Sequence, residues 1–194
     1  MELGGNAPAI VFEDANLDVA VEGVMLAKMR NLGEACTAAN RIYVHSSIAP
    51  AFTEKFTSAM AELKIGNGLE AGIDVGPLVN SDTRKKVDAF VQDAVAKGAK
   101  VELGGVLPTG KGFFYPPTVL SGVPETADCV GDEIFGPVAA LQVFNDQEDV
   151  IRRANDTEYG LVAYVFSEDM KRALQVCERL DYGMVGLNLS LIHI

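Results

Sequence analysis

The chain has few of the residues that build disulfide frameworks, metal sites and nucleic-acid surfaces. Its 194 residues include three cysteines and two histidines, and 16 basic residues stand against 27 acidic ones. The odd number of cysteines and the absence of a metal-ligand spacing argue against a disulfide framework and a zinc site. The net charge of −11 would repel a phosphate backbone, so nucleic acid is not an expected partner.

Long apolar runs and a dinucleotide fingerprint are also lacking. No run approaches the roughly 18 apolar residues that span a bilayer, and the chain does not open on a basic segment followed by an apolar one, as a secretory signal does. We therefore expect no contact with a membrane and a cytoplasmic location. No Gly-x-Gly-x-x-Gly follows a strand, so the chain carries no dinucleotide-binding fingerprint of its own.

Short apolar runs alternate with helical patterns along the chain. Strands are expected at 9–12, 42–45, 101–103, 113–120, 138–144, 161–166 and 184–188, and helices at about 14–30, 48–65, 81–97, 146–155 and 169–180. Ser46 or Ser47 is the expected cap of the second helix, and Pro116-Pro117 make 113–120 an edge strand. This alternation predicts one α/β domain with a mainly parallel sheet and helices on both faces.

Cys36 lies between a glycine turn and the strand that begins near Ile42. A lone cysteine is often a small buried hydrophobic residue, and it is also a candidate nucleophile in an intracellular enzyme. His45 is predicted to lie on the strand only nine residues past Cys36, so a cysteine–histidine pair is not expected.

Four short motifs change the interpretation of this cysteine. In chain order they are Glu2-Leu3-Gly4-Gly5, Gly33-Glu34-Ala35-Cys36, Glu133-Ile134-Phe135-Gly136-Pro137 and Asn155-Asp156-Thr157-Glu158-Tyr159-Gly160-Leu161. With this order and spacing they resemble the active-site signatures of the aldehyde dehydrogenase superfamily.

The resemblance implies oxidation of an aldehyde to a carboxylic acid with NAD or NADP. It makes Cys36 the nucleophile and Glu2 the base that activates water for hydrolysis of the thioester. It makes Glu133 the residue that binds the nicotinamide ribose, and it packs Phe135 near the nicotinamide. Outside this context, Glu2 would be read as a solvated terminal charge and Glu133 as a helix cap. Gly4-Gly5 is expected to allow a close backbone approach or an unusual φ rather than phosphate binding.

Within the superfamily, the chain most resembles the succinate-semialdehyde dehydrogenases. Asn6-Ala7-Pro8 and the pair Arg30-Asn31, just before Cys36, carry this likeness. It implies that Arg30 binds the substrate carboxylate, for which a planar guanidinium is well suited. The alternative is that Arg30 is a cation at a helix C-terminus, where it interacts with the macrodipole. One departure is Glu34, which stands where the family usually has glutamine and adds a negative charge near Cys36.

The resemblance covers residues 1–188, which would form the catalytic domain of a longer enzyme without its cofactor-binding domain and its oxyanion-binding asparagine. Residues 189–194 resemble translated adaptor DNA and are excluded from the interpretation. We expect the 194 residues alone to be inactive and the full-length enzyme to form a dimer or tetramer. The competing hypotheses are another semialdehyde or general aldehyde dehydrogenase, and a non-catalytic oligomerisation domain.

Overall fold

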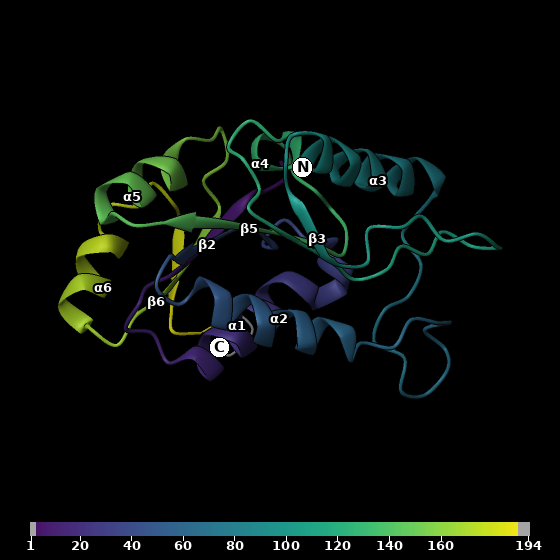
Figure 1. Ribbon diagram of the computed structural model, residues 1–194, viewed down its shortest axis with the longest axis horizontal. Helices are drawn as coiled ribbons and strands as arrows, with labels where there is room; N and C mark the ends of the chain where they lie inside the picture. The colour runs from purple at the N-terminus through teal and green to yellow at the C-terminus, as the bar shows by residue number, and fades with distance from the viewer. Residues whose placement is uncertain (1–2, 190–194) are drawn as a thin grey trace.

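The computed structural model describes residues 3–189, which form a seven-stranded sheet between two layers of helices (Figure 1). The strands are β1 (Ala7–Val11), β2 (Ala39–His45), β3 (Lys100–Leu103), β4 (Thr118–Ser121), β5 (Val138–Phe144), β6 (Val162–Phe166) and β7 (Met184–Leu187). The helices are α1 (Leu17–Met29), the 3-10 turn η1 (Arg30–Gly33), α2 (Ala49–Ala61), α3 (Ser81–Ala96), α4 (Asp128–Gly131), α5 (Gln147–Asn155) and α6 (Met170–Cys177).

The sheet is parallel except at one edge. Its strand order is β3-β4-β5-β2-β1-β6-β7, and only the pairing of β3 with β4 is antiparallel. Consecutive parallel strands need crossover connections, and helices provide most of them here. The predicted fold class, a mainly parallel α/β sheet with helices on both faces, is confirmed.

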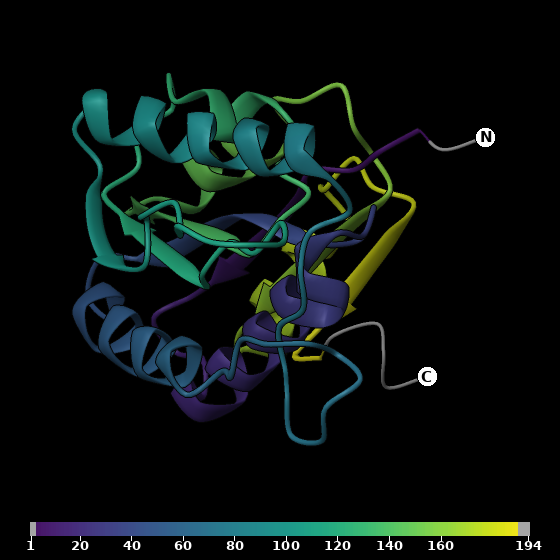
Figure 2. The ribbon, with the colours of Figure 1, turned by 90° about the vertical axis from the view of Figure 1, so that its right-hand side faces the viewer.

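Alternation along β1 shows how the two faces are covered. Ala9 and Val11 pack into the cluster formed with α1 and α2, whereas Ile10 packs on the opposite face with α5 and α6. The rest of that opposite face packs against α3 and α4. Because successive strand residues point to opposite faces, the β1 run of buried residues serves both layers at once. Figure 2 shows α3 on one side of the sheet and α1 and α2 on the other.

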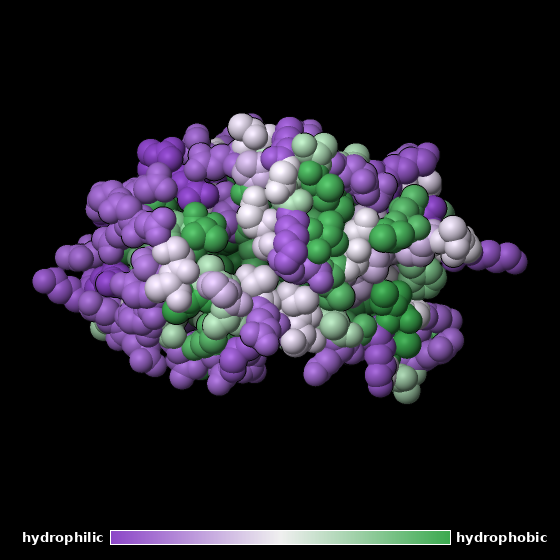
Figure 3. All heavy atoms as spheres, in the orientation of Figure 1, coloured by the Kyte–Doolittle hydropathy of each residue, from purple (hydrophilic) through white to green (hydrophobic). Residues whose placement is uncertain are grey.

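The surface differs from one end of the molecule to the other. Figure 3 shows polar side chains over the end formed by α5 and α6, and apolar ones reaching the surface toward the opposite end. Exposed large apolar residues occur in the loops between α2 and β4, at Leu69, Val79, Val106, Leu107 and Phe113. Apart from the adjacent pair Val106 and Leu107, they are separated from one another along the chain.

Several sequence-based expectations were wrong in detail, including the end of α2, which lies at Ala61 rather than at residue 65. Neither serine caps α2: its N-cap is Ile48, and Ser46 and Ser47 instead bond to Asn145 and His45. The strand β4 is interior, because the two prolines lie just before it and leave its ladder complete on both sides. Helix α6 ends at Cys177, three residues before the predicted end.

Candidate functional site

Four loops meet at the amino edge of the parallel sheet. The glycine pair precedes β1, Cys36 precedes β2, the segment 133–137 precedes β5, and the segment 155–161 precedes β6. These four strands are neighbours in the order β5-β2-β1-β6. Since parallel strands begin at the same edge, motifs that lie up to about 150 positions apart in the sequence come together in space.

Cys36 occupies a tight turn that three contacts hold in place. The Ala38 N–H donates to the Ala35 carbonyl oxygen at 3.0 Å, which closes a β-turn around Cys36 and Thr37. The Tyr164 hydroxyl donates to the Thr37 carbonyl oxygen at 2.8 Å. Cys36 itself is half-buried. Cys36 is therefore partly accessible, and two hydrogen bonds hold the main chain on either side of it.

The third contact is made by Gly5. A Cβ atom on residue 5 would lie 1.8 Å from the Cys36 carbonyl oxygen, so only glycine permits this approach. Gly4 has a φ of +72°, in the left-handed region. The expectation that the glycine pair serves close approach and unusual φ is thus confirmed.

The backbone around the cysteine loop is strained where it meets the segment 133–137. Asn31 and Leu32 have φ values of 48° and 61°, and Phe135 has a φ of 55°. A Cβ atom on Gly33 would lie 2.4 Å from the Gly136 carbonyl oxygen, so the two loops touch. Left-handed backbone at non-glycine residues costs about 1–3 kcal/mol each and tends to cluster at functional sites.

Glu133 contacts the glycine pair directly. Its carboxylate Oε1 accepts the Gly5 N–H at 2.8 Å. A Cβ atom on Gly4 would lie 3.2 Å from its other carboxylate oxygen. Glu133 is therefore placed at the site by its own loop and by the segment before β1.

A cavity of about 500 Å³ opens beside Cys36. Its lining residues come from three of the four motifs: Leu3, Gly4, Cys36, Glu158, Tyr159, Gly160 and Leu161. This volume lies within the range of about 300–1,000 Å³ that is typical of ligand pockets. Two other grooves have volumes of about 670 Å³ each, one between α1 and α2 and one between α2 and residues of β3, β4 and β5, and Cys36 lines neither of them.

Arg30 lies outside this cavity, at the C-terminal cap of α1. Its side chain is exposed, and between residues 3 and 189 no carboxylate forms an ion pair with it. Burial raises the pKa of Tyr164 to about 12, and the charges of Arg30 and Cys36 act on the same hydroxyl. The position is compatible both with a carboxylate clamp and with a helix-terminal cation.

The remaining predicted residues have different outcomes. Phe135 is half-buried in the loop that touches Gly33. Glu34 points toward another loop, where its carboxylate accepts the Val79 N–H at 3.2 Å, and burial raises its pKa. Glu2 and residues 190–194 lie outside the described residues.

Sequence reasoning missed two residues that organise the site, Tyr164 and Arg41. Arg41 is buried, and its guanidinium donates to the carbonyl oxygens of Asn6, Arg153 and Ala154 and to the Tyr182 hydroxyl, at 2.7–3.1 Å. Arg41 therefore connects Asn6, which follows the glycine pair, to helix α5, which precedes the cavity-lining residues 158–161. The sequence signal that could have identified Arg41 is a charged residue at the start of an apolar strand.

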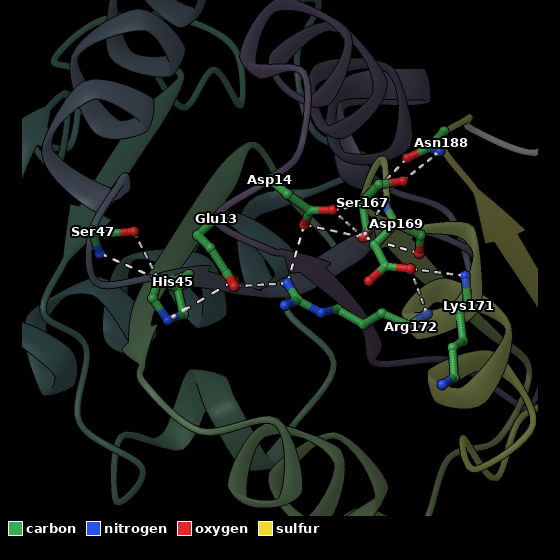
Figure 4. Close-up of polar contacts among 9 residues, drawn as sticks. All are labelled: Glu13, Asp14, His45, Ser47, Ser167, Asp169, Lys171, Arg172 and Asn188. Atoms are coloured by element: carbon green, nitrogen blue, oxygen red, sulfur yellow. Dashed lines mark hydrogen bonds and ion pairs between the residues drawn. The ribbon is translucent and has the colours of Figure 1, made fainter.

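The carboxyl edge of the sheet carries a second polar cluster, which its own contacts satisfy (Figure 4). Arg172 contacts Glu13 at 2.8 Å and Asp14 at 3.2 Å, and Asp14 accepts the Ser167 hydroxyl and the Asp169 N–H. His45 belongs to this cluster, at the opposite end of β2 from Cys36. That separation agrees with the expectation that His45 does not pair with the cysteine.

None of the helices between residues 3 and 189 combines the length and apolarity needed to cross a bilayer.

Comparison with known proteins agrees with this geometry. The model of the aldehyde dehydrogenase family matches residues 1–193. A succinate-semialdehyde dehydrogenase of Paenarthrobacter nicotinovorans is 53% identical over 99% of this chain and 43% of its own length. A glutarate-semialdehyde dehydrogenase of Pseudomonas putida is 52% identical over 99% of this chain and 40% of its own length.

A solved structure gives the same result. The crystal structure of succinate-semialdehyde dehydrogenase from Burkholderia pseudomallei matches with a TM-score of 0.96 and 48% identity, over 98% of this chain and 40% of that one. The chain thus spans about two fifths of the length of the relatives that it matches. With its four motifs assembled around Cys36, the chain belongs to the aldehyde dehydrogenase family.

Proposed function

We propose that this chain is the catalytic-domain part of an NAD(P)-dependent dehydrogenase that oxidises a short carboxy-aldehyde, with succinate semialdehyde as the preferred substrate. One observation carries the proposal: Cys36 and Gly4 line one cavity, and Glu133 is bonded to the next residue, Gly5. Residues 1–188 would supply this domain, and the cofactor-binding domain would lie elsewhere in the complete enzyme.

Cys36 acts as the nucleophile in this proposal. Its thiolate attacks the aldehyde carbon and forms a carbon–sulfur bond, which gives a thiohemiacetal. After loss of hydride, the acyl group remains on Cys36 as a thioester. Glu2 takes a proton from the water that attacks this thioester, the carbon–sulfur bond breaks, and the free acid leaves. The turn that holds Cys36 fixes the direction of attack.

The residues present fit a nicotinamide cofactor. The wall of the cavity beside Cys36 lacks a Cβ atom at Gly4, which leaves room for a flat ring. The carboxylate of Glu133 lies against Gly4 and can accept hydrogen bonds from ribose hydroxyls. Phe135 adds an aromatic ring to the same loop. Bound NAD or NADP supplies the hydride acceptor.

Arg30 is proposed to bind the substrate carboxylate. Its side chain is exposed, and its charge acts on the hydroxyl of Tyr164, which contacts the main chain next to Cys36. If the Arg30 guanidinium binds the carboxylate of a short carboxy-aldehyde, the aldehyde group at the other end of that substrate would lie at the Cys36 thiol. The names of the relatives, succinate- and glutarate-semialdehyde dehydrogenase, describe substrates of this kind.

Two alternatives follow from the same relatives and fold. Glutarate semialdehyde, which is longer by one methylene, is the second candidate substrate, because a glutarate-semialdehyde dehydrogenase is almost as similar to this chain. A non-catalytic oligomerisation domain is the alternative from another class. We also propose a homo-oligomeric complete enzyme and a cytoplasmic location, and we expect the 194 residues alone to bind no cofactor.

The test is steady-state oxidation by the complete enzyme of succinate semialdehyde, glutarate semialdehyde and propanal, each with NAD and with NADP. Cys36→Ala is expected to abolish oxidation of all three. Glu2→Gln is expected to lower the rate of acid release by roughly 10²–10⁴-fold, the usual contribution of a positioned base, while a first burst of reduced cofactor remains. Oxidation by Cys36→Ala at the unsubstituted rate would refute the proposal.

A further inference from the structure

Lys28 is a completely buried lysine directly behind the cysteine loop. It lies in the last turn of α1, and its exposed fraction is 0%. Its Nζ donates to the Asn40 side-chain oxygen at 2.8 Å. Lysine is almost never fully buried unless it is paired, and the hydrogen-bond partner here is a neutral amide rather than a carboxylate.

Asn40 extends this contact to the glycine pair. Its side-chain N–H₂ donates to the Gly5 carbonyl oxygen at 3.4 Å, a long hydrogen bond. On the other side of the same residue, the Gly5 N–H donates to the Glu133 carboxylate at 2.8 Å. Hydrogen bonds therefore hold both the N–H and the carbonyl oxygen of Gly5. Gly5 is also the residue that packs against the Cys36 carbonyl.

Two titratable groups on other elements interact with Lys28. Burial lowers the pKa of Lys28 to about 7, while Cys129 in α4 and Glu133 in the loop before β5 act in the opposite direction. The contact from β2 is the neutral Asn40. Near neutral pH, the attraction between Lys28 and Glu133 therefore depends on the protonation of the lysine.

We propose that Lys28 and Asn40 are positioning residues of the catalytic site, which hold the Gly5 peptide and, through it, fix Glu133 and the main chain of Cys36. The role assigned to Glu133 rests on the proposed function, whereas the hold on Cys36 rests on the contacts alone. Neither residue touches the cavity beside Cys36. Their effect is therefore indirect and acts on the geometry of the nucleophile and of the cofactor-binding carboxylate.

Two variants of the complete enzyme separate this role from simple packing. Lys28→Met keeps a side chain of similar length but has neither a donor nor a charge. Asn40→Asp keeps an acceptor for Lys28 but cannot donate to the Gly5 carbonyl. Lys55→Met is the control, because Lys55 forms only a surface ion pair with Asp18.

The first readout needs no cofactor and no substrate. Iodoacetamide labelling followed by peptide mapping gives the separate rates of Cys36, Cys129 and Cys177. Loss of one hydrogen bond corresponds to about 0.5–1.5 kcal/mol, so both variants are expected to change the Cys36 rate by about two- to tenfold. The Cys177 rate is expected to stay unchanged in both variants, and the Cys129 rate is expected to stay unchanged in Asn40→Asp. In Lys28→Met the Cys129 rate is expected to fall, because the Lys28 charge lowers the pKa of that thiol.

The second readout is cofactor affinity as a function of pH, followed by fluorescence of the reduced cofactor. Lys28→Met is expected to raise the dissociation constant by on the order of tenfold, equivalent to about 1.4 kcal/mol. The unsubstituted enzyme is expected to show a midpoint near pH 7 in this affinity, which Lys28→Met removes and Lys55→Met keeps.

Two results would overturn the proposal. One is an unchanged Cys36 rate together with unchanged cofactor affinity in both variants. The other is a joint increase in the reactivity of all three cysteines, or loss of folding in both variants, because these residues would then support the fold as a whole. A changed Cys36 rate in an enzyme that binds no cofactor would support the positioning role while the proposed function fails.

Discussion

Gly5 packs directly against the main-chain carbonyl of Cys36, although 31 positions separate the two residues in the sequence. This contact joins the segment before β1 to the turn before β2, and it exists because glycine has no Cβ atom. The position of the proposed nucleophile therefore depends on a residue that carries no chemistry of its own.

Replacement of Gly5 by alanine tests this contact. The added methyl group has no space, and overpacking of this kind costs about 1–3 kcal/mol. We expect Gly5→Ala to lower the free energy of unfolding by that amount in urea denaturation and to change the alkylation rate of Cys36. Gly68→Ala is the matched control, because a Cβ atom there meets no atom within 4 Å. An equal effect of both substitutions would contradict the account.

Tyr164 is predicted to hold the cysteine turn through a single hydrogen bond. Tyr164→Phe removes the donor to the Thr37 carbonyl and should cost about 0.5–1.5 kcal/mol of stability, with a changed Cys36 alkylation rate. Tyr115→Phe removes a hydroxyl hydrogen bond to the Asp88 carboxylate, outside the four motifs, and should leave the Cys36 rate unchanged. If Tyr164→Phe also leaves that rate unchanged, Tyr164 does not position the turn.

Arg30 is predicted to determine the preference for carboxy-aldehydes. Arg30→Ala should raise the KM for succinate semialdehyde by roughly tenfold or more, since a charge-assisted contact contributes about 1.5–3 kcal/mol, and should change the KM for propanal little. Steady-state kinetics on the two substrates measures this. A preference for succinate semialdehyde that survives the substitution would show that the clamp is assigned wrongly and would favour the helix-terminal role.

The sequence predicted some parts of the fold and of the candidate site better than others. The strands around β1, β2, β5 and β6 follow from short apolar runs between turn signals, and the motifs give the residues before them. The contact between Gly5 and Cys36 could not be predicted from local pattern, because it depends on which strands are neighbours. The same holds for Tyr164, whose partner lies 127 positions away, and for Arg41, three of whose four partners lie more than 100 positions away.

The N-cap of α2 shows that a local sequence preference can also give a wrong prediction. Ser46 and Ser47 are good caps by residue type, but the chain leaves β2 so that both side chains face other partners, Asn145 and His45. Local propensity was overridden there by the contacts at the carboxyl edge of the sheet. The burial of Lys28 beside the site is likewise visible only in the packed structure.

The cluster at the carboxyl edge predicts a pH-dependent stability. Burial raises the pKa of Asp14, but hydrogen bonds from the Asp169 N–H and the Ser167 hydroxyl outweigh this and hold the pKa below its ordinary value of 3.8. A carboxyl with a lowered pKa stabilises the fold fully above its unfolded value and loses this contribution as the pH falls through the folded value.

Asp14→Asn is therefore expected to destabilise the protein most at neutral pH, with a difference from the unsubstituted protein that narrows below about pH 4. Urea denaturation at several pH values measures it, and Glu70→Gln, at an exposed loop position, is the control. A difference that does not depend on pH would mean that the Asp14 contacts do not require its charge.

Selective labelling of Cys36 in the complete enzyme tests the central claim most directly. Burial raises the pKa of Cys129 to about 11 and also raises that of Cys177, so both thiols should react slowly with limiting iodoacetamide. Peptide mapping with and without NAD or NADP is expected to find Cys36 labelled first, at a rate that the cofactor changes. Labelling spread equally over the three cysteines, or absent from Cys36, would contradict the assignment of Cys36 as the nucleophile.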